Sequence, residues 1–236
     1  HTTHLRMRAR ADAAARNTAD LTFDYVSASW STADAGDSKS VSARIENIGT
    51  SSSGSFRWGL YLSTDTTITT SDTLLDDWSE SSISAGSYRS RSKTITIPAS
   101  MTGGYYYIGG IVDINSQVSE SNENNNEDHD SGRVHIYEQP DLIGRSCSAT
   151  TTGTVGNSIG STISLYLEND VSSSHGASSG TFYWAMYLST DNTITSSDTK
   201  VGSNQYASSL SGGSYRSDSL SSSTTIPSSL NAGTYY

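Results

Sequence analysis

The residues best placed to do chemistry are four aspartates that occur in two copies of one pattern. Asp65 and Asp72 lie in a stretch rich in Ser and Thr, and Asp191 and Asp198 stand at the matching places of a similar stretch. Calcium binds carboxylate and carbonyl oxygens with flexible geometry. We therefore predict these four aspartates as calcium ligands. Asp65 and Asp72 are expected at the pole that Glu138 and Asn169-Asp170 also face, where an ion would stiffen the junction between the copies. The alternative is that each accepts hydrogen bonds from nearby backbone N–H groups in a turn. The lack of a full EF-hand pattern favours the turn.

A second acidic group lies in and around an asparagine-rich segment. Its members are Asp113, Glu120, Glu123, Glu127 and Asp128. A run of this kind is usually a solvated face that protects a sheet edge from pairing with other chains. The alternative is an adhesive or ion-dependent surface.

Catalytic machinery is missing from the sequence. A nucleophilic hydroxyl needs a base beside it, yet none of the five histidines recurs in the other copy: His1, His4, His129, His135 and His175. No Gly-x-Ser-x-Gly elbow and no phosphate-cradling loop is present. We therefore predict that the chain is not an enzyme and needs no cofactor, with Ca²⁺ as the one ligand worth considering.

Composition narrows the class of protein further. The net charge of -10, with lysine only at Lys39, Lys93 and Lys200, argues against nucleic acid as a partner. Cys147 is alone, so an intrachain disulfide cannot form. No apolar run reaches the length of a membrane-spanning helix. The abundance of Ser, Thr, Asn and Gly with acidic charge favours an extracellular or cell-surface location.

An internal repeat divides the chain. Residues 56–73 recur as residues 182–199, a spacing typical of one small domain. Strands with alternating apolar residues are predicted at 19–26, 40–47, 56–62, 88–97, 104–114 and 133–137, with residues 63–77 as a polar excursion. Short strands of this number indicate an all-β fold of two tandem immunoglobulin-like β-sandwiches, with Trp58 and Trp184 in the cores. We expect an extended arm or leader at 1–18, domains at 19–137 and 141–236, and a linker at 138–140.

Several motifs in this order resemble those of CARDB, the cell-adhesion-related domain of bacteria and archaea. They are Tyr61-Leu62-Ser63-Thr64-Asp65, Thr96-Ile97-Pro98, Gly104-Tyr105-Tyr106-Tyr107-Ile108, Val112-Asp113 and Val118-Ser119-Glu120-Ser121-Asn122-Glu123-Asn124-Asn125-Asn126. The resemblance covers residues 20–137 completely and 140–236 in part. It implies an immunoglobulin-like sandwich in secreted or surface-attached proteins of prokaryotes, often beside a protease or other catalytic domain. It implies no catalytic residues.

The second copy lacks the counterparts of the last strands of the first, because the repeat reaches only Gly233-Thr234-Tyr235-Tyr236. An incomplete sandwich has an open edge that an extended segment of another chain can complete. Leu5, Met7, Ala9 and Ala11 alternate as a donated strand requires, and Tyr235 and Tyr236 lie at the accepting edge. This predicts a homo-oligomer or filament built head to tail. The simpler interpretation is a natural polypeptide that continues beyond Tyr236.

Exposed tryptophans offer an alternative function. Sugars stack on aromatic rings, and Trp30 and Trp78 are the two tryptophans without a core role or a counterpart in the second copy. They are the basis for the alternative prediction of a carbohydrate-binding accessory module of a secreted hydrolase or protease, with surface glycans as partners.

Overall fold

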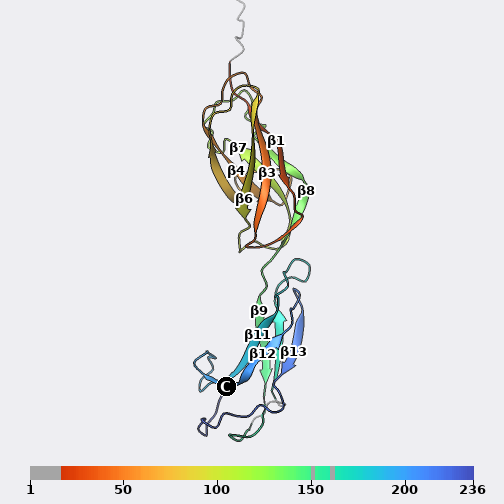
Figure 1. Ribbon diagram of the computed structural model, residues 1–236, viewed down its shortest axis with the longest axis vertical. Helices are drawn as coiled ribbons and strands as arrows, with labels where there is room; N and C mark the ends of the chain where they lie inside the picture. Colours follow the sequence, from red (N-terminus) through yellow and green to blue (C-terminus); the bar gives the residue numbers. More distant parts are fainter. Residues whose placement is uncertain (1–16, 150–151, 160–162) are drawn as a thin grey trace, which may run out of the picture. The chain divides into compact units, whose positions relative to one another are not determined.

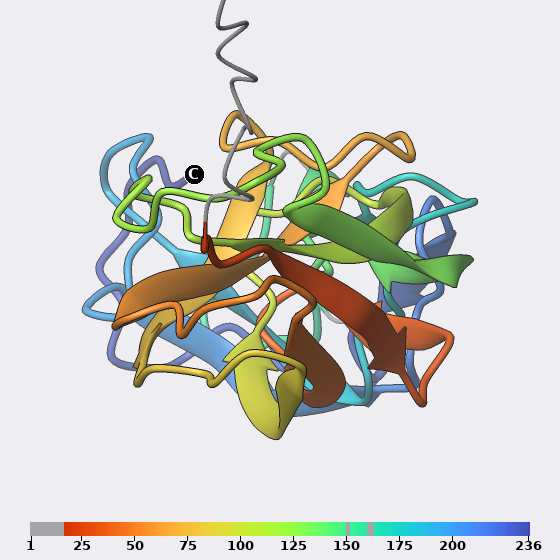
Figure 2. The ribbon, with the colours of Figure 1, turned by 90° about the horizontal axis from the view of Figure 1, so that it is seen from above.

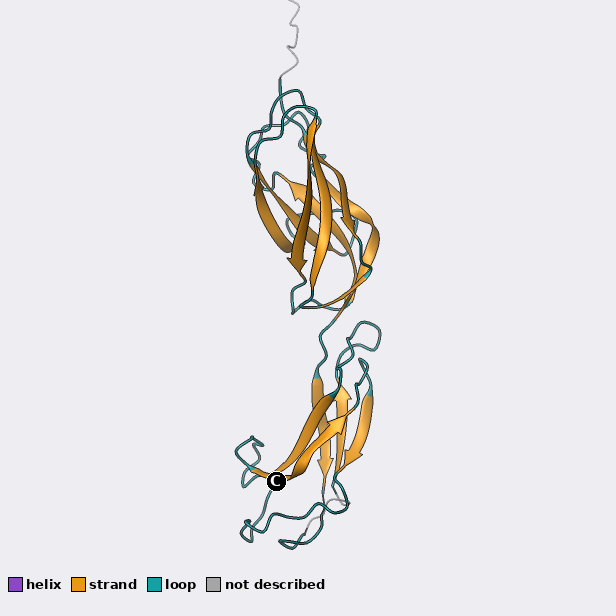
Figure 3. Ribbon diagram, viewed as in Figure 1, coloured by secondary structure: helices purple, strands orange, loops and turns teal. Residues whose placement is uncertain are grey.

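The computed structural model describes residues 17–149, 152–159 and 163–236. This part of the chain consists of strands and loops (Figure 3). None of its segments is a helix long and apolar enough to cross a membrane. The chain divides into two compact units, one with most of strands β1 to β8 and the other with strands β9 to β13.

The first sheet of the first unit has three antiparallel strands. They are β1 (Leu21–Ala28), β3 (Ser38–Asn47) and β6 (Ser87–Thr96), in the order β1-β3-β6 (Figure 1). Alternating small apolar residues of β3 point inward, and Val41, Ala43 and Ile45 are almost completely buried. This is the period of a strand with one face on the core.

The second sheet has five strands in the order β2-β8-β7-β4-β5. These are β2 (Thr32–Asp34), β4 (Phe56–Ser63), β5 (Thr73–Glu80), β7 (Gly104–Val112) and β8 (Glu127–Tyr137). The short strand β2 pairs parallel to the end of β8. Seen from above, β1, β3 and β6 form one layer, and the green strands β7 and β8 lie in the other (Figure 2).

The core between these layers is built around Trp58, whose side chain is 1% exposed. Its ring meets Phe23 edge to face, with the ring centroids 6.2 Å apart, and lies 4.8 Å from the ring of Trp78 on the neighbouring strand. The prediction that Trp58 is a core residue is therefore confirmed.

Two parts of this unit differ from the sequence-based expectation. Residues 73–80 form strand β5, whereas residues 73–77 were expected to belong to the polar excursion at 63–77. Cross-strand pairing with β4 outweighs their acidic composition. Tyr61 points to the outer face of β4 and is nevertheless 3% exposed. The loop after β4 folds back over this face, where Ile68 packs against Gly109. A Cβ at Gly109 would lie only 2.3 Å from Ile68, so this position needs glycine.

The second unit repeats the arrangement of the first in part. Strands β9 (Leu142–Ser148), β10 (Ser164–Asn169) and β13 (Tyr215–Ser219) form a sheet in the order β13-β10-β9, which matches β6-β3-β1. Strands β11 (Phe182–Leu188) and β12 (Thr199–Ala207) pair as β4 and β5 do. Its core contains Trp184, Met186, Leu167 and Val201, which confirms the predicted place of Trp184.

The predicted all-β, immunoglobulin-like fold is confirmed, with two sheets of strands in each unit. The domain boundaries at 137 and 141 stay a prediction. The predicted donor residues Leu5, Met7, Ala9 and Ala11 lie outside the described residues.

Candidate functional site

The predicted calcium ligands of the first unit cap their own turn. The backbone N–H of Thr67 donates to Asp65 Oδ1 at 2.8 Å. The backbone N–H of Thr69 donates to Asp72 Oδ2 at 2.7 Å, and the Thr69 hydroxyl donates to the same oxygen at 3.0 Å. Such bonds are the turn chemistry that short polar side chains provide. Both carboxylates therefore already stabilise the turn in which they lie.

The second unit repeats these contacts. The backbone N–H of Thr193 donates to Asp191 Oδ1 at 2.7 Å, and that of Thr195 donates to Asp198 Oδ2 at 2.6 Å. The Thr195 N–H is also the main cause that lowers the pKa of Asp198. Within residues 17–149, 152–159 and 163–236, no group of three or more His, Cys, Asp or Glu residues is arranged to hold a metal ion. Calcium at these four aspartates stays a prediction.

A buried asparagine closes one end of the first unit. Asn47 is 0% exposed, and its Oδ1 accepts from the backbone N–H groups of Asp20 and Gly49, both at 3.1 Å. Its Nδ2 donates to the carbonyls of Ser51 and Ile83, both at 2.8 Å. One side chain thus joins three segments of backbone. The sequence signal for it was the repeat of Ile45-Glu46-Asn47 at residues 167–169.

Asn169 joins segments of backbone in the second unit in the same way. It is also 0% exposed, and its Oδ1 accepts from the N–H of Asp141 at 2.9 Å. Its Nδ2 donates to the carbonyls of Ala177 and Leu210, at 3.0 and 3.1 Å. The two units therefore share a buried, hydrogen-bonded asparagine as well as a strand order.

The loop that joins β7 to β8 starts from a buried aspartate. Asp113 is 5% exposed and has a φ of 47°, in the left-handed region. Its two carboxylate oxygens accept from the N–H groups of Gln117 and Val118, both at 2.8 Å. The acidic group around it was expected to be a solvated face, but Asp113 is an internal support of its own loop.

Glu120 lies further along the same loop and is as a whole more exposed than Asp113. Both of its carboxylate oxygens expose less than 1 Å² and have no hydrogen-bond partner among the described residues. Burial raises the pKa of Glu120 to about 7, and repulsion from Glu123 and Asp113 adds to this effect. The Asn126 side chain and the Leu21 N–H lower this pKa, but neither completes a hydrogen bond to Glu120.

We expect this carboxylate to make stability depend on pH. The pKa of Glu120 rises on folding, so the folded chain holds a proton that the unfolded chain has lost. Stability should be highest below pH 4.5 as far as Glu120 is concerned, and should fall as the pH rises through about 7. Thermal unfolding across this range in a calcium-free buffer measures the effect. In Glu120→Gln the decline should flatten, whereas Asp76→Asn, at an exposed carboxylate, should retain it. An unchanged decline in Glu120→Gln would contradict the assignment.

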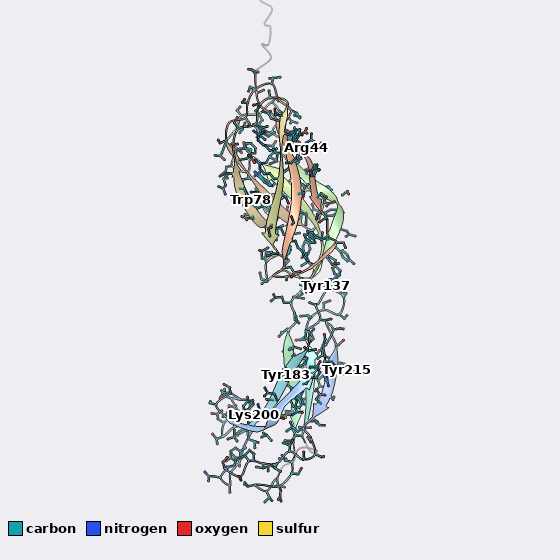
Figure 4. All side chains as sticks on the ribbon, viewed as in Figure 1. Arg44, Trp78, Tyr137, Tyr183, Lys200 and Tyr215 are labelled. Carbon is teal, nitrogen blue, oxygen red and sulfur yellow. The ribbon has the colours of Figure 1, made fainter. Side chains whose placement is uncertain are left out.

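One side of the first unit is closed by contacts between its two sheets. Arg91 on β6 binds Glu80 on β5 through two hydrogen bonds, of 2.6 and 2.7 Å, and the Glu80 side chain is 5% exposed. Trp78 lies in the first unit beside this pair (Figure 4). Lys93 Nζ lies 4.8 Å from the centroid of its ring. The Trp78 ring thus lies between Trp58 and Lys93, and both of these neighbours contribute to closing the sandwich.

The other tryptophan proposed for sugar binding also has a structural partner. The Trp30 Nε1–H donates to the carbonyl of Ser40 at 2.9 Å. Lys39 Nζ lies 5.9 Å from the centroid of its ring. No contact in the described residues favours glycan binding, and that alternative stays a prediction.

The second unit closes the equivalent side with different residues. The strand registers place Ala207 where Glu80 stands and Asp218 where Arg91 stands. Asp218 accepts from the Nε1–H of Trp184 at 3.1 Å. The matching indole nitrogen of Trp58 is buried without a partner in the described residues. The second unit thus lacks this ion pair and has instead a hydrogen bond between its core tryptophan and Asp218.

In the part of the chain that the structure describes, no strand covers the β11 edge of the second unit, whereas β7 covers β4 in the first. Ser189 and Tyr236 exchange two backbone hydrogen bonds, of 3.1 and 2.9 Å, and so repeat the pairing of Ser63 with Tyr107. Tyr236 thus corresponds in structure to Tyr107, whereas the sequence repeat aligns it with Tyr106.

Beyond this pair the apolar surface is uncovered. Ile194, the counterpart of the buried Ile68, is 52% exposed. A cavity of about 520 Å³ lies beside Leu188, Ile226, Leu230 and Tyr235. The predicted assembly residues Tyr235 and Tyr236 therefore stand at an open edge.

Part of this chain is similar to known proteins. Residues 18–130 match the family model described as CARDB. Among solved structures, the chain is similar to the CARDB domain of a Pyrococcus furiosus protein in complex with di-metal ions, with 21% identity over 50% of this chain and 89% of that one, at a TM-score of 0.39. It is also similar to a domain of a protein thought to lie at the cell surface of Methanosarcina acetivorans, with 22% identity over 51% of this chain and 94% of that one, at a TM-score of 0.37. No curated protein matched the sequence.

The first unit is thus an immunoglobulin-like β-sandwich. Its residues 18–130 match the CARDB family, a non-catalytic module related to cell adhesion. The resemblance stated from the sequence motifs is confirmed for this part of the chain.

Proposed function

We propose that this chain is an extracellular, non-enzymatic adhesion and spacer module that assembles head to tail into a filament. The observation that carries the surface location and the adhesion role is the match of residues 18–130 to the CARDB family model. Among the described residues, the apolar surface beside β11 is where the proposed contact between copies would form.

Strand β7 of the first unit supplies a template for the missing strand. Its inward residues Ile108 and Val112 are completely buried, and Gly110 between them touches the ring of Phe23. In the second unit, Gly144 takes the place of Phe23 in the sequence repeat, so a strand there has room for a small side chain at the central position. An extended segment with alternating apolar residues satisfies this pattern.

The N-terminal residues of a second copy are the occupant that we propose. Leu5, Met7, Ala9 and Ala11 alternate in the required way, with larger residues first and smaller residues after them. Arg6, Arg8 and Arg10 between them carry positive charge toward a chain with a net charge of -10. Each copy would donate one segment and accept another, which gives an open chain of subunits.

Assembly of this kind predicts fibres that depend on the first 18 residues. We expect the full chain to form concentration-dependent fibres in electron micrographs and by light scattering. Deletion of residues 1–18 should abolish them, because the donor is lost while both sandwiches remain. A synthetic peptide of residues 1–18 should block fibre growth, and a peptide with Leu5 and Met7 replaced by Asp should not. Particles that stay monomeric at all concentrations would refute strand donation. A longer natural polypeptide, seen by mass spectrometry, would remove the reason to propose it.

A further inference from the structure

We propose that two exposed tyrosines beside the uncovered edge of β11 bind arginine side chains from the N-terminal segment of a second copy, a contact that rests on the strand donation proposed above. The tyrosines lie on the outer face of the sheet of β11 and β12, where Tyr183 is 68% exposed and Tyr206 is 60% exposed. They are register partners on the two strands, and their ring centroids lie 5.8 Å apart, edge to face. The outer face of this sheet therefore presents a pair of aromatic rings to solvent.

The first unit has charged and polar residues at the same places. The strand registers put Arg57 where Tyr183 stands and Ser79 where Tyr206 stands. Arg57 forms an ion pair with Asp77 and donates to the Ser79 hydroxyl at 3.2 Å. The outer face of β4 and β5 thus has its partners within the unit, whereas the matching face of β11 and β12 has two rings in their place.

Aromatic rings of the first unit also have cations of their own. A Lys or Arg side chain lies within 5.9 Å of the ring centroid at four residues, which are Trp30, Trp78, Tyr88 and Tyr105. Among the residues that the structure describes, no Lys or Arg is placed in this way at Tyr183 or Tyr206. The face of an aromatic ring attracts a guanidinium group, so these two rings are suited to a cation from another chain.

A strand donated beside β11 would turn its arginines toward this face. Successive side chains of a strand point to opposite faces of a sheet. On β11, Trp184 and Met186 belong to the core, and Tyr183 points outward. When the apolar residues of the donated segment face the same core, the residues between them face outward. These residues are Arg6, Arg8 and Arg10, which lie outside the described residues.

The pairing in the first unit supplies a register for the donated strand. Tyr236 pairs with β11 as the residue before Ile108 pairs with β4, so a donated strand would begin at the place of Ile108. With its first apolar residue, Leu5, at that place, Arg10 stands opposite Tyr183. The arginine two residues earlier is a diagonal neighbour, and a side chain of this length also reaches the rings.

Charges on the two strands do not offer a rival partner. Strands β11 and β12 carry one charged side chain, that of Lys200. Lys200 stands opposite Tyr187, further along β11 than Tyr183, and its amino group donates to the side chain of Asn204 (Figure 4). Because neither strand has an aspartate or glutamate, the rings are the groups on this face that attract a donated arginine.

Fibre growth by the full chain tests the contact. In the double variant Tyr183→Thr with Tyr206→Thr, the protein concentration needed for fibres should rise by about tenfold, because cation–π contacts are lost. Threonine suits a strand and both tyrosines are exposed, so the second unit should still fold, and its Tm verifies this. The variant Tyr183→Phe with Tyr206→Phe should recover most of the loss, because both rings remain.

The matched control is Tyr215→Thr. Tyr215 is 64% exposed and lies on β13, in the other sheet of the second unit (Figure 4). Its replacement removes a similar aromatic surface away from β11, so fibres should form at the same concentration as in the parent chain.

Peptides test the donor side of the contact. A peptide of residues 1–18 with Arg8 and Arg10 replaced by glutamine should block fibre growth of the parent about tenfold less well than the natural peptide. Against the double threonine variant, the difference between the two peptides should largely disappear, because the rings that distinguish them are gone.

The outcomes separate this contact from strand donation itself. If the parent forms fibres and the double threonine variant forms them at the same concentration, the contact is refuted and donation stands. Equal weakening by Tyr215→Thr, or a difference between the peptides that persists in the double threonine variant, gives the arginines another partner and also overturns the contact. A parent chain that forms no fibres refutes donation, and the contact with it.

Discussion

Replacement of Asn47 by alanine should destabilise the first unit by about 4 kcal/mol, because four hydrogen bonds are lost together. Two of them, from the Asp20 N–H and to the Ile83 carbonyl, are buried. Each orphaned group costs about 1–3 kcal/mol, less whatever water regains by entering the vacated space. Chemical denaturation followed by tryptophan fluorescence measures this loss. Trp30, Trp58 and Trp78 report mainly on the first unit.

The matched control is Asn122→Ala. Asn122 is exposed, and its side-chain oxygen accepts one bond, from the N–H of Asn124 at 3.2 Å. Its replacement should cost no more than about 0.5 kcal/mol. Asn169→Ala should instead destabilise the second unit, as seen by Trp184. Equal denaturation midpoints for Asn47→Ala and Asn122→Ala would show that the buried amide does not hold the segments together.

Arg91→Met should destabilise the first unit by about 3 kcal/mol, because it leaves the buried Glu80 carboxylate without its charge partner. The loss should change little with salt, since the carboxylate is shielded from solvent ions. Thermal and chemical unfolding at low and high ionic strength measure both effects. Arg89→Met is the control, because Arg89 donates only to the carbonyl of neighbouring Tyr88 among the contacts described.

The double variant Glu80→Leu with Arg91→Met separates pairing from packing. Removal of both charges should restore most of the stability, because apolar groups of similar size often replace a buried ion pair at no net cost. The second unit already does without the pair, with Ala207 at the place of Glu80. If the double variant is as unstable as Arg91→Met alone, the loss comes from packing and the ion pair has no special role.

The sequence predicted the strands with clear alternation and failed where tertiary contacts decide. Apolar residues at every second place in β3 and the repeat around Trp58 were sufficient to predict the sandwich. Strand β5 was missed because Asp76 and Asp77 resemble a loop, whereas pairing with β4 determines its structure. Burial of Tyr61 was also missed, since it depends on a loop that folds back over the sheet.

The candidate sites were predicted less well, for a related reason. Asp65 and Asp72 attract attention as repeated carboxylates, yet each binds backbone N–H groups of its own turn. Glu120 belonged to a run that seemed to be a solvated face. Its burial comes from the neighbouring strand start at Ala19, which forms a parallel bridge with Glu120 from a distant part of the sequence. Residue types show which side chains could be charged, but their burial depends on contacts between segments that are distant in the sequence.

The parallel pairing of β2 with β8 has a mechanical consequence. The chain enters the first sandwich through β1 and β2 and leaves it at the end of β8, where Thr32, Ala33 and Asp34 lie opposite His135, Ile136 and Tyr137. Because the paired strands run in the same direction, a pull on the two ends slides one strand along the other. Sliding loads all the bonds of the pair at once, whereas peeling would break them one after another. The topology thus suits a domain that bears tension between its two ends.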